Sequence, residues 1–150
     1  MNLLRTYEKL STWPLGKKIF SSLVCLKAPY FASISPLITH LTKNDIVVEV
    51  RKRHKVLNHI KTVHAIAMAN ACELAAGVLM QVGLPGHMRW IPKSMNITYL
   101  KKAETSVIAK THVGDWMQIG VGDNIIKVEV FDKGMNKVVE ADITMWISLK

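Results

Sequence analysis

Three residues with reactive or hydrogen-bonding side chains lie around the start of a long apolar segment. Asn58 and His64 come just before the segment, and Glu73 lies in its middle as the single Asp, Glu, Lys or Arg residue between Lys61 and Arg89. A carboxylate among alanine and aliphatic residues is costly to bury without a partner or a task. Its chemistry would be that of a general base that activates water, or of a nucleophile that attacks a carbonyl group directly.

The spacing of these residues limits how they can cooperate. His64 and Glu73 are nine residues apart, and at about 100° per residue they would point to opposite sides of a helix. The spacing therefore indicates that they do not serve one site within one chain.

The elements that carry these residues can be predicted from periodicity. The alanine-rich segment after Thr62 predicts a helix that ends near Gly83, with Pro85-Gly86 as its stop. Apolar and polar residues alternate over 45–53, 94–103, 105–113, 124–131 and 137–149, which predicts five strands. The small residues along the helix would let strands approach closely. We therefore expect an α+β fold, with an antiparallel sheet curled around one helix that is buried nearly all round.

Helical spacing also predicts two short helices in an N-terminal extension, residues 1–36, with a new helix start near Pro14. Lys17, Lys18 and Lys27 lie near the apolar stripe of the second helix. We interpret the extension either as helices packed over the body or as a membrane-surface or lid element. The core of the single domain is expected over residues 40–150.

Composition bounds the class of protein. A chain of 150 residues can bury a core without disulfides. The net charge of +9 favours anionic partners, but the basic residues are scattered and only Arg51–Lys55 resembles a cluster.

Cys25 and Cys72 lie in apolar contexts and predict free thiols in a reducing compartment. Residues 65–84 are too weakly apolar to predict a membrane span, so a soluble, cytoplasmic protein is expected. No spacing indicates a metal site or another cofactor.

The order and spacing of Asn58, His64 and Glu73 resemble the Asn…His-Gly…Asp/Glu signature of hotdog-fold acyl-CoA thioesterases, a superfamily that includes the phenylacetate-pathway enzymes. The order of strand, loop, long helix and four strands is similar as well, over about residues 40–150. The segment from His87 to Ala103 resembles a poorly characterised branch of the superfamily. The family usually has glycine after the histidine, and often another before it; this chain has Ala65 and Lys61.

The resemblance implies a homodimer with two equivalent composite sites, and two such dimers could pair into a tetramer. In each site the helix carboxylate of one protomer would meet the loop and helix start of its neighbour. Glu73 would be the base or nucleophile, and the amides of Ala65 and Ile66 would stabilise the oxyanion. Asn58 would hold the water molecule or the carbonyl group, and His64 would fix the loop by hydrogen bonding.

The substrate implied is an acyl-CoA or acyl-carrier-protein thioester. Its acyl chain would run past Met68, Leu79 and Met95. The anionic carrier would lie on basic loops. The residues predicted to bind substrate are Ile66, Met68, Arg89, Lys93, Lys101 and Lys102.

Other interpretations stay open. Glu73 could be a structural carboxylate paired across the dimer, His64 a hydrogen-bonded loop or core residue, and Asn58 a turn residue. The second function is a non-catalytic acyl- or lipid-binding protein of the same fold, which Lys61 and Ala65 favour. A basic nucleic-acid-binding protein is a third, but the sequence has no recognised motif for it and no nucleic acid is expected as a partner.

Overall fold

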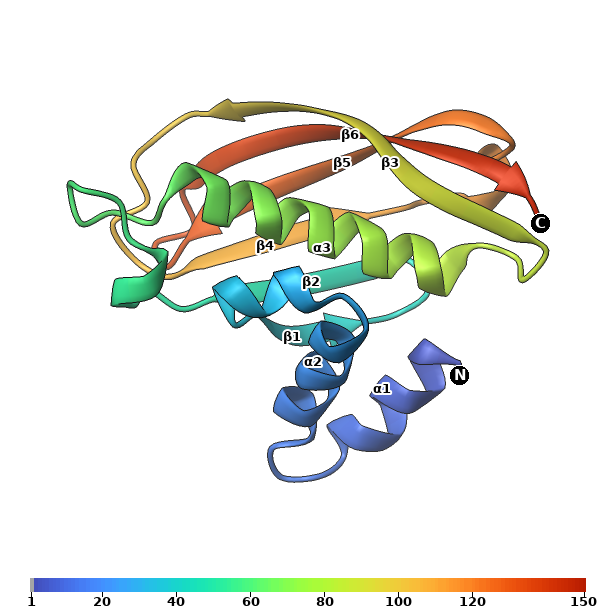
Figure 1. The fold of residues 1–150 in the computed structure, drawn as a ribbon, viewed down its shortest axis with the longest axis horizontal. Helices are drawn as coiled ribbons and strands as arrows, with labels where there is room; N and C mark the ends of the chain where they lie inside the picture. Colours follow the sequence, from blue (N-terminus) through green and yellow to red (C-terminus); the bar gives the residue numbers. More distant parts are fainter. Residues whose placement is uncertain (1) are drawn as a thin grey trace.

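The computed structural model describes residues 2–150 and contains one antiparallel sheet curled around one long helix (Figure 1). The helix α3 (Ala65–Gly83) follows the second strand. The strands lie in the order β1-β2-β4-β5-β6-β3. Their bounds in chain order are β1 (Leu37–Leu41), β2 (Asp45–Val50), β3 (Met88–Tyr99), β4 (Val107–His112), β5 (Gly122–Asp132) and β6 (Lys137–Leu149). The predicted α+β architecture is confirmed.

Alternation along the strands builds the core against α3. In β2, Ile46, Val48 and Val50 are buried, and the residues between them point to the outer face. The same pattern recurs in β5 and β6, and α3 adds Leu74 and Leu79 to the core. This helix is the one element in residues 2–150 that is long and apolar enough to cross a membrane, but most of it is buried within the protein. Its hydropathy is that of a core helix.

Two helices precede the sheet and protrude from it as a separate lobe (Figure 1). They are α1 (Leu3–Ser11) and α2 (Gly16–Lys27), where helical spacing predicts them. A Cβ at Gly16 would lie 1.6 Å from the carbonyl oxygen of Leu10, so glycine is required where the two helices meet. Tyr7 packs edge-on against Phe20, with ring centroids 5.1 Å apart.

The inner side of this lobe covers the edge strand β1. The Ser21 hydroxyl accepts a hydrogen bond from the backbone N–H of Ile38 at 2.9 Å. The carbonyl oxygen of Thr39 accepts bonds from the Tyr7 hydroxyl at 2.9 Å and the Lys17 ammonium group at 2.7 Å. These side chains satisfy backbone groups that an edge strand would otherwise leave open.

The structure differs from the sequence prediction at two strands. β1 was not among the predicted strands; it is five residues long, and a register shift between Ile38 and His40 interrupts its alternation. β3 begins at Met88 and ends at Tyr99, whereas 94–103 was predicted. Pro92 concealed the first half of β3. It is tolerated because β3 is an edge strand with a register shift between Pro92 and Ser94.

Short 3-10 helices complete the connections. η1 (Pro29–Ile34) links the lobe to β1, η2 (His54–Val56) precedes the loop that enters α3, and η3 (Trp116–Gln118) lies between β4 and β5.

Candidate functional site

Glu73 lies on the outward flank of α3 and is only partly buried. On this helix Ile66 and Ala69 precede it at helical spacing and are also partly or fully exposed, whereas the remaining faces are buried. Glu73 forms no ion pair and no side-chain hydrogen bond with any residue from 2 to 150. It is therefore a carboxylate set beside the core, accessible and without a charged partner inside its own protomer.

Strand β3 runs along the same flank of α3. The Tyr99 hydroxyl donates a hydrogen bond to the carbonyl oxygen of Ala65 at 3.1 Å, at the helix start. At the other end of the strand the indole of Trp90 packs on Gly77, where a Cβ would lie 2.9 Å from the ring. Glu73 lies on the helix between these two contacts, and so beside the middle of β3. The open edge of the sheet is thus close to the carboxylate.

The helix start offers a free backbone donor. His64 is the N-cap residue, and its Nδ1 accepts a hydrogen bond from the Ile66 N–H at 3.0 Å. The Ala65 N–H is too close to the helix start to bond within the helix, and no side chain or other backbone group in residues 2–150 accepts its hydrogen bond. Of the two predicted oxyanion donors, Ala65 is free and Ile66 is not. His64 holds the helix start, as its loop-fixing role requires.

Asn58 uses its side chain within its own loop. The Asn58 Oδ1 accepts from the N–H groups of Ile60 and Thr62, at 3.1 and 3.0 Å, and its Nδ2 donates to the Thr62 hydroxyl at 2.8 Å. These bonds are those of a turn residue. Lys61 in this loop has a φ of 61°, the left-handed region that favours glycine. Ala65 has no positive φ, so its Cβ causes no backbone strain.

One protomer does not bring the carboxylate and the free amide to one point. Eight residues separate Ala65 from Glu73, which corresponds to about 12 Å along a helix axis. A thioester carbonyl group spans a small fraction of that length. The two groups can act on one substrate only if a second chain supplies one of them.

A buried polar residue on α3 was not among the predicted site residues. Asn70 donates through Nδ2 to the Ser33 hydroxyl of η1 at 3.2 Å. Its Oδ1 is the one buried side-chain polar atom without a partner in residues 2–150. Asn70 precedes Glu73 by one helical turn, toward η1. The signal in the sequence was an amide inside an alanine-rich run.

The predicted basic contacts do not form one patch within the chain. Lys93 pairs with Asp123 at 2.8 Å, and Arg89 donates to a serine hydroxyl at 3.0 Å. Lys101 and Lys102 follow the other end of β3, and twelve residues of strand correspond to roughly 35–40 Å. In an antiparallel pair of β3 strands, however, the start of one strand would lie beside the end of the other.

The residues of the predicted acyl path differ in exposure. Met68 and Leu79 are buried in the core of the described chain. Their helix faces inward at these positions, which the sequence alone did not reveal because apolar residues surround α3. Ile66 is exposed and Met95 is partly buried, and both remain accessible on the β3 side of the helix.

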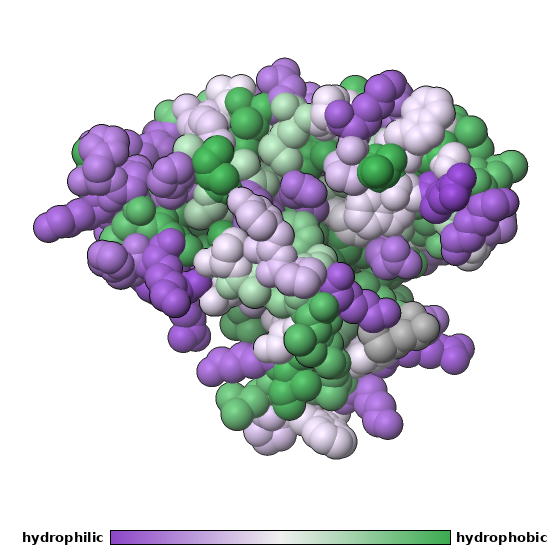
Figure 2. Space-filling model, viewed as in Figure 1, coloured by the Kyte–Doolittle hydropathy of each residue, from purple (hydrophilic) through white to green (hydrophobic). Residues whose placement is uncertain are grey.

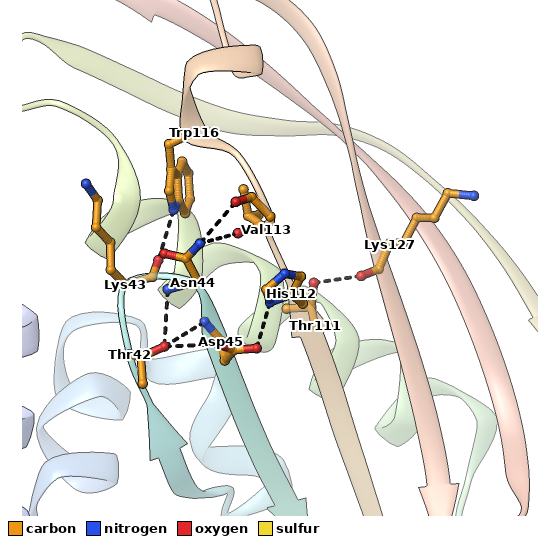
Figure 3. A network of polar contacts seen from close by, with 10 residues as sticks. Thr42, Lys43, Asn44, Asp45, Thr111, His112, Val113, Trp116 and Lys127 are labelled. Carbon is orange, nitrogen blue, oxygen red and sulfur yellow. Dashed lines mark hydrogen bonds and ion pairs between the residues drawn. The ribbon is translucent and has the colours of Figure 1, made fainter.

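A polar network fixes the far end of α3 (Figure 3). Trp116 donates through Nε1 to the carbonyl oxygen of Lys43 at 3.1 Å, and Asn44 Nδ2 donates to the carbonyl oxygen of Val113 at 2.7 Å. The indole of Trp116 fills a notch over Gly83, where a Cβ would lie 1.9 Å from the ring. The β1–β2 turn thereby holds the end of the helix that carries Glu73.

A groove of about 780 Å³ lies on the outer face of the sheet, away from α3. It contains the exposed pair His112 and Asp45, whose Nδ1 and Oδ1 are 2.7 Å apart. The sheet separates this groove from Glu73, so it is not part of the candidate site.

The chain matches a family model and solved structures of similar fold. A family model described as a domain of unknown function (DUF4442) matches residues 16–147. A structural-genomics target of known structure is 36% identical, with 99% of both chains covered and a TM-score of 0.85. No curated protein sequence matches the chain.

Two more distant structures carry the name thioesterase. A probable thioesterase of unknown function from Pseudomonas aeruginosa is 15% identical, with 92% of this chain and 97% of that chain covered and a TM-score of 0.80. A hypothetical thioesterase from Streptococcus pneumoniae, solved with coenzyme A, is 14% identical, with 84% and 98% covered and a TM-score of 0.71. At these identities the similarity shows the fold, which is the hotdog fold that the sequence resemblance implied.

Proposed function

We propose that this chain, which belongs to the DUF4442 family and has the hotdog fold of thioesterases, hydrolyses acyl thioesters. The observation that carries the proposal is Glu73, a partly buried carboxylate with no ion pair or hydrogen bond in residues 2–150. A structural carboxylate beside a core would be expected to have a partner. An accessible carboxylate without one is free to act as a base.

The open edge of β3 supports a dimeric site. β3 pairs with β6 on one side and leaves its other edge open along 12 residues. The edge also exposes apolar side chains such as Ile91, which is 60% exposed. A long open edge of this kind is a surface for pairing with another chain. Antiparallel pairing about a two-fold axis would place two α3 helices side by side in opposite directions.

The contacts between β3 and α3 define the register that the proposed site requires. Tyr99 of β3 contacts Ala65 of α3, and Trp90 of β3 contacts Gly77 of α3. Interpolation between these two contacts places Glu73 beside about Lys93. A two-fold axis near Asn96 would then bring Glu73 of one protomer beside the Ala65 amide of the other. The composite site would contain the two groups that a single protomer keeps about 12 Å apart.

The proposed hydrolysis begins with the activation of a water molecule. Glu73 takes a proton from water, and the resulting hydroxide attacks the thioester carbonyl carbon. The negative charge on the oxygen of the tetrahedral intermediate is stabilised by the Ala65 N–H and by the positive end of the helix dipole. The carbon–sulfur bond then breaks, the thiolate leaves, and the proton held by Glu73 neutralises it. In the nucleophilic variant Glu73 attacks the carbon itself, the carbon–sulfur bond breaks and the thiolate leaves, so that a mixed anhydride forms. Water then hydrolyses the anhydride, which restores the Glu73 carboxylate and supplies the proton that the thiolate takes up.

The substrate class is proposed to be an acyl-CoA, with acyl-carrier-protein thioesters as the alternative carrier. The coenzyme A in the pneumococcal hypothetical thioesterase supports the first. Its phosphates would meet basic residues from both ends of paired β3 strands, with Arg89 and Lys93 from one chain and Lys101 and Lys102 from the other. The acyl chain would enter between α3 and β3 at Ile66 and Met95.

A non-catalytic acyl-binding protein of the same fold is the second candidate. One observation favours it: His64 occupies the Ile66 amide, which leaves free only one of the two predicted oxyanion donors. An oxyanion site with one donor stabilises the transition state less than one with two.

The experiment is hydrolysis of acyl-CoAs over a range of chain lengths by the wild type, Glu73→Gln and the exposed control Glu104→Gln. We expect kcat/KM of Glu73→Gln to fall by about 10²-fold or more, and the control to match the wild type. Equal rates for all three proteins would contradict the role of Glu73. Tight binding of an acyl-CoA without turnover by the wild type would select the second candidate.

A further inference from the structure

The outer side of the N-terminal lobe exposes an apolar surface that no part of the described chain covers. Trp13, Leu15, Ile19 and Leu26 are 59%, 67%, 45% and 76% exposed. Figure 2 shows hydrophobic residues gathered over the lobe below the body, with hydrophilic residues on both sides. We call Trp13, Leu15, Ile19 and Leu26 the lobe patch.

Three members of the patch lie along one side of α2, with the exposed Ser22 between Ile19 and Leu26. At about 100° per residue, Leu15, Ile19 and Leu26 fall within roughly 40° of one another on the helix and extend over about 17 Å. The opposite side of the helix carries Phe20 and Val24, which are buried against the body. Since packing already uses that inner side, the outer stripe is not required for the fold. Trp13 lies at the tip of the lobe, in the connection from α1.

The charge around the patch has one sign. Residues 2–44 contain six basic residues and one acidic residue, Glu8, and so supply +5 of the total charge of +9. By helical position Lys18 lies on one side of the stripe and Lys27 on the other. Neither lysine forms an ion pair within residues 2–150. Lys17 differs, because its ammonium group bonds to β1.

We propose that the lobe patch docks the protein on an anionic phospholipid surface, with α2 lying in the plane of the interface. An apolar stripe with flanking lysines and a tryptophan at one end has the composition of an interfacial helix. The apolar side chains enter the boundary between headgroups and acyl chains, and the lysines meet the lipid phosphates. This binding is independent of the proposed hydrolysis, since the lobe patch and Glu73 share no residue.

A second copy of the chain fits the patch less well. Two lobes packed face to face would set lysines against lysines with no acidic residue of α2 to compensate. A surface rich in phosphate complements the same charges. The positive field also extends along α1, where Lys9 is exposed.

Vesicle sedimentation with the full chain tests the proposal. The vesicles are phosphatidylcholine with about one third phosphatidylglycerol, compared with phosphatidylcholine alone. Measurements are made at an ionic strength of about 0.1 M, where the Debye length is roughly 10 Å, and again at about 1 M, where it is roughly 3 Å. We expect binding to the anionic vesicles, loss of binding at the shorter screening length, and weak binding to neutral vesicles. A wild-type protein that stays in the supernatant with anionic vesicles would overturn the proposal.

Matched variants locate the contact. Leu26→Asp is expected to lower partitioning at least tenfold, and Lys18→Glu about fivefold or more. The controls are Met117→Asp, at a side chain that is 92% exposed on η3, and Lys133→Glu on the β5–β6 turn, and both should bind like the wild type. Thermal unfolding of each variant checks that the lobe still folds. Binding unaffected by Leu26→Asp and Lys18→Glu would refute the assignment to the lobe patch.

Tryptophan fluorescence adds a second readout. Emission quenched by brominated lipids in the wild type should be lost in Trp13→Phe, because the other three tryptophans lie outside the lobe. If sedimentation shows no vesicle binding while Leu26→Asp abolishes concentration-dependent self-association, the patch is an interface between copies and the membrane proposal is wrong.

Discussion

Two variants that are inactive alone should restore activity when their subunits are mixed. Ala65→Pro removes the backbone N–H that would hold the oxyanion and leaves most of the structure unchanged. Ala65 is the first residue of α3, where proline is well tolerated. His64 before it has an extended backbone, φ −62° and ψ 139°, which a following proline requires. The second variant is Glu73→Gln.

The magnitude follows from the composite geometry. Each variant alone should lose about 10²–10³ in kcat, since one lacks the oxyanion donor and the other lacks the base. Random mixing of equal amounts gives about half mixed dimers. In a mixed dimer one site carries both changes, and the other site joins an unaltered Glu73 to an unaltered Ala65. About one quarter of the wild-type rate should therefore return.

The assay is acyl-CoA hydrolysis after refolding the two variants together and, separately, each alone. Native mass spectrometry of the mixture measures how completely subunits exchange, because the two variants differ in mass. Ala65→Gly, which keeps the N–H, should remain close to wild-type activity on its own. Activity of the mixture that equals the mean of the two inactive variants, with exchange shown to be complete, would refute the two-chain site.

Three further predictions concern stability and reactivity. Gly83→Ala should lower the free energy of unfolding, measured by urea titration, by about 2–3 kcal/mol, because its Cβ would lie 1.9 Å from the Trp116 ring. In a Trp116→Ala background the same change should cost almost nothing, and additive effects of the two substitutions would contradict the contact between Gly83 and the indole. Lys61→Gly should raise the free energy of unfolding by about 0.5–1 kcal/mol, because φ is 61° at this position. Lys61→Ala should leave the free energy of unfolding unchanged, and a decrease in Lys61→Gly would contradict the left-handed conformation. Burial raises the pKa of Cys72 to about 12, so its thiolate is scarce at about pH 8. A thiol reagent should therefore modify Cys25 alone in the native protein and both thiols in denaturant. Modification of Cys72 in the native protein as fast as in denaturant would show that the core opens.

The parts of the fold that periodicity predicted are those that are long and have one buried face. β6 was predicted with the bounds it has, and the end of α3 was placed at Gly83, because a long alternating strand and an apolar helix followed by Pro85-Gly86 leave little ambiguity. β1 and the first half of β3 are edge segments. Their outer positions do not have to be polar, and one of them contains Pro92, so their patterns are weak.

The candidate site was predictable in position and less so in detail. The order of Asn58, His64 and Glu73 located the loop and the helix. The hydrogen bond from the Ile66 amide to His64, and the position of Asn70 against η1, depend on side-chain geometry and tertiary packing that residue spacing does not encode. The burial of Met68 could not be inferred either, since α3 is apolar on almost every side.

The two edges of the sheet, β1 and β3, differ in how open they are to pairing with another strand. At β1 the hydroxyl groups of Ser21 and Tyr7 and the ammonium group of Lys17 occupy backbone positions that an incoming strand would need. At β3 those positions are open, although Pro92 removes one donor from the ladder. A molecule with a single receptive edge can pair strand to strand with one copy of itself, and no second edge is then free for a third copy. The side chains that hold the lobe in place thereby oppose head-to-tail strand pairing, the usual hazard of an unprotected edge.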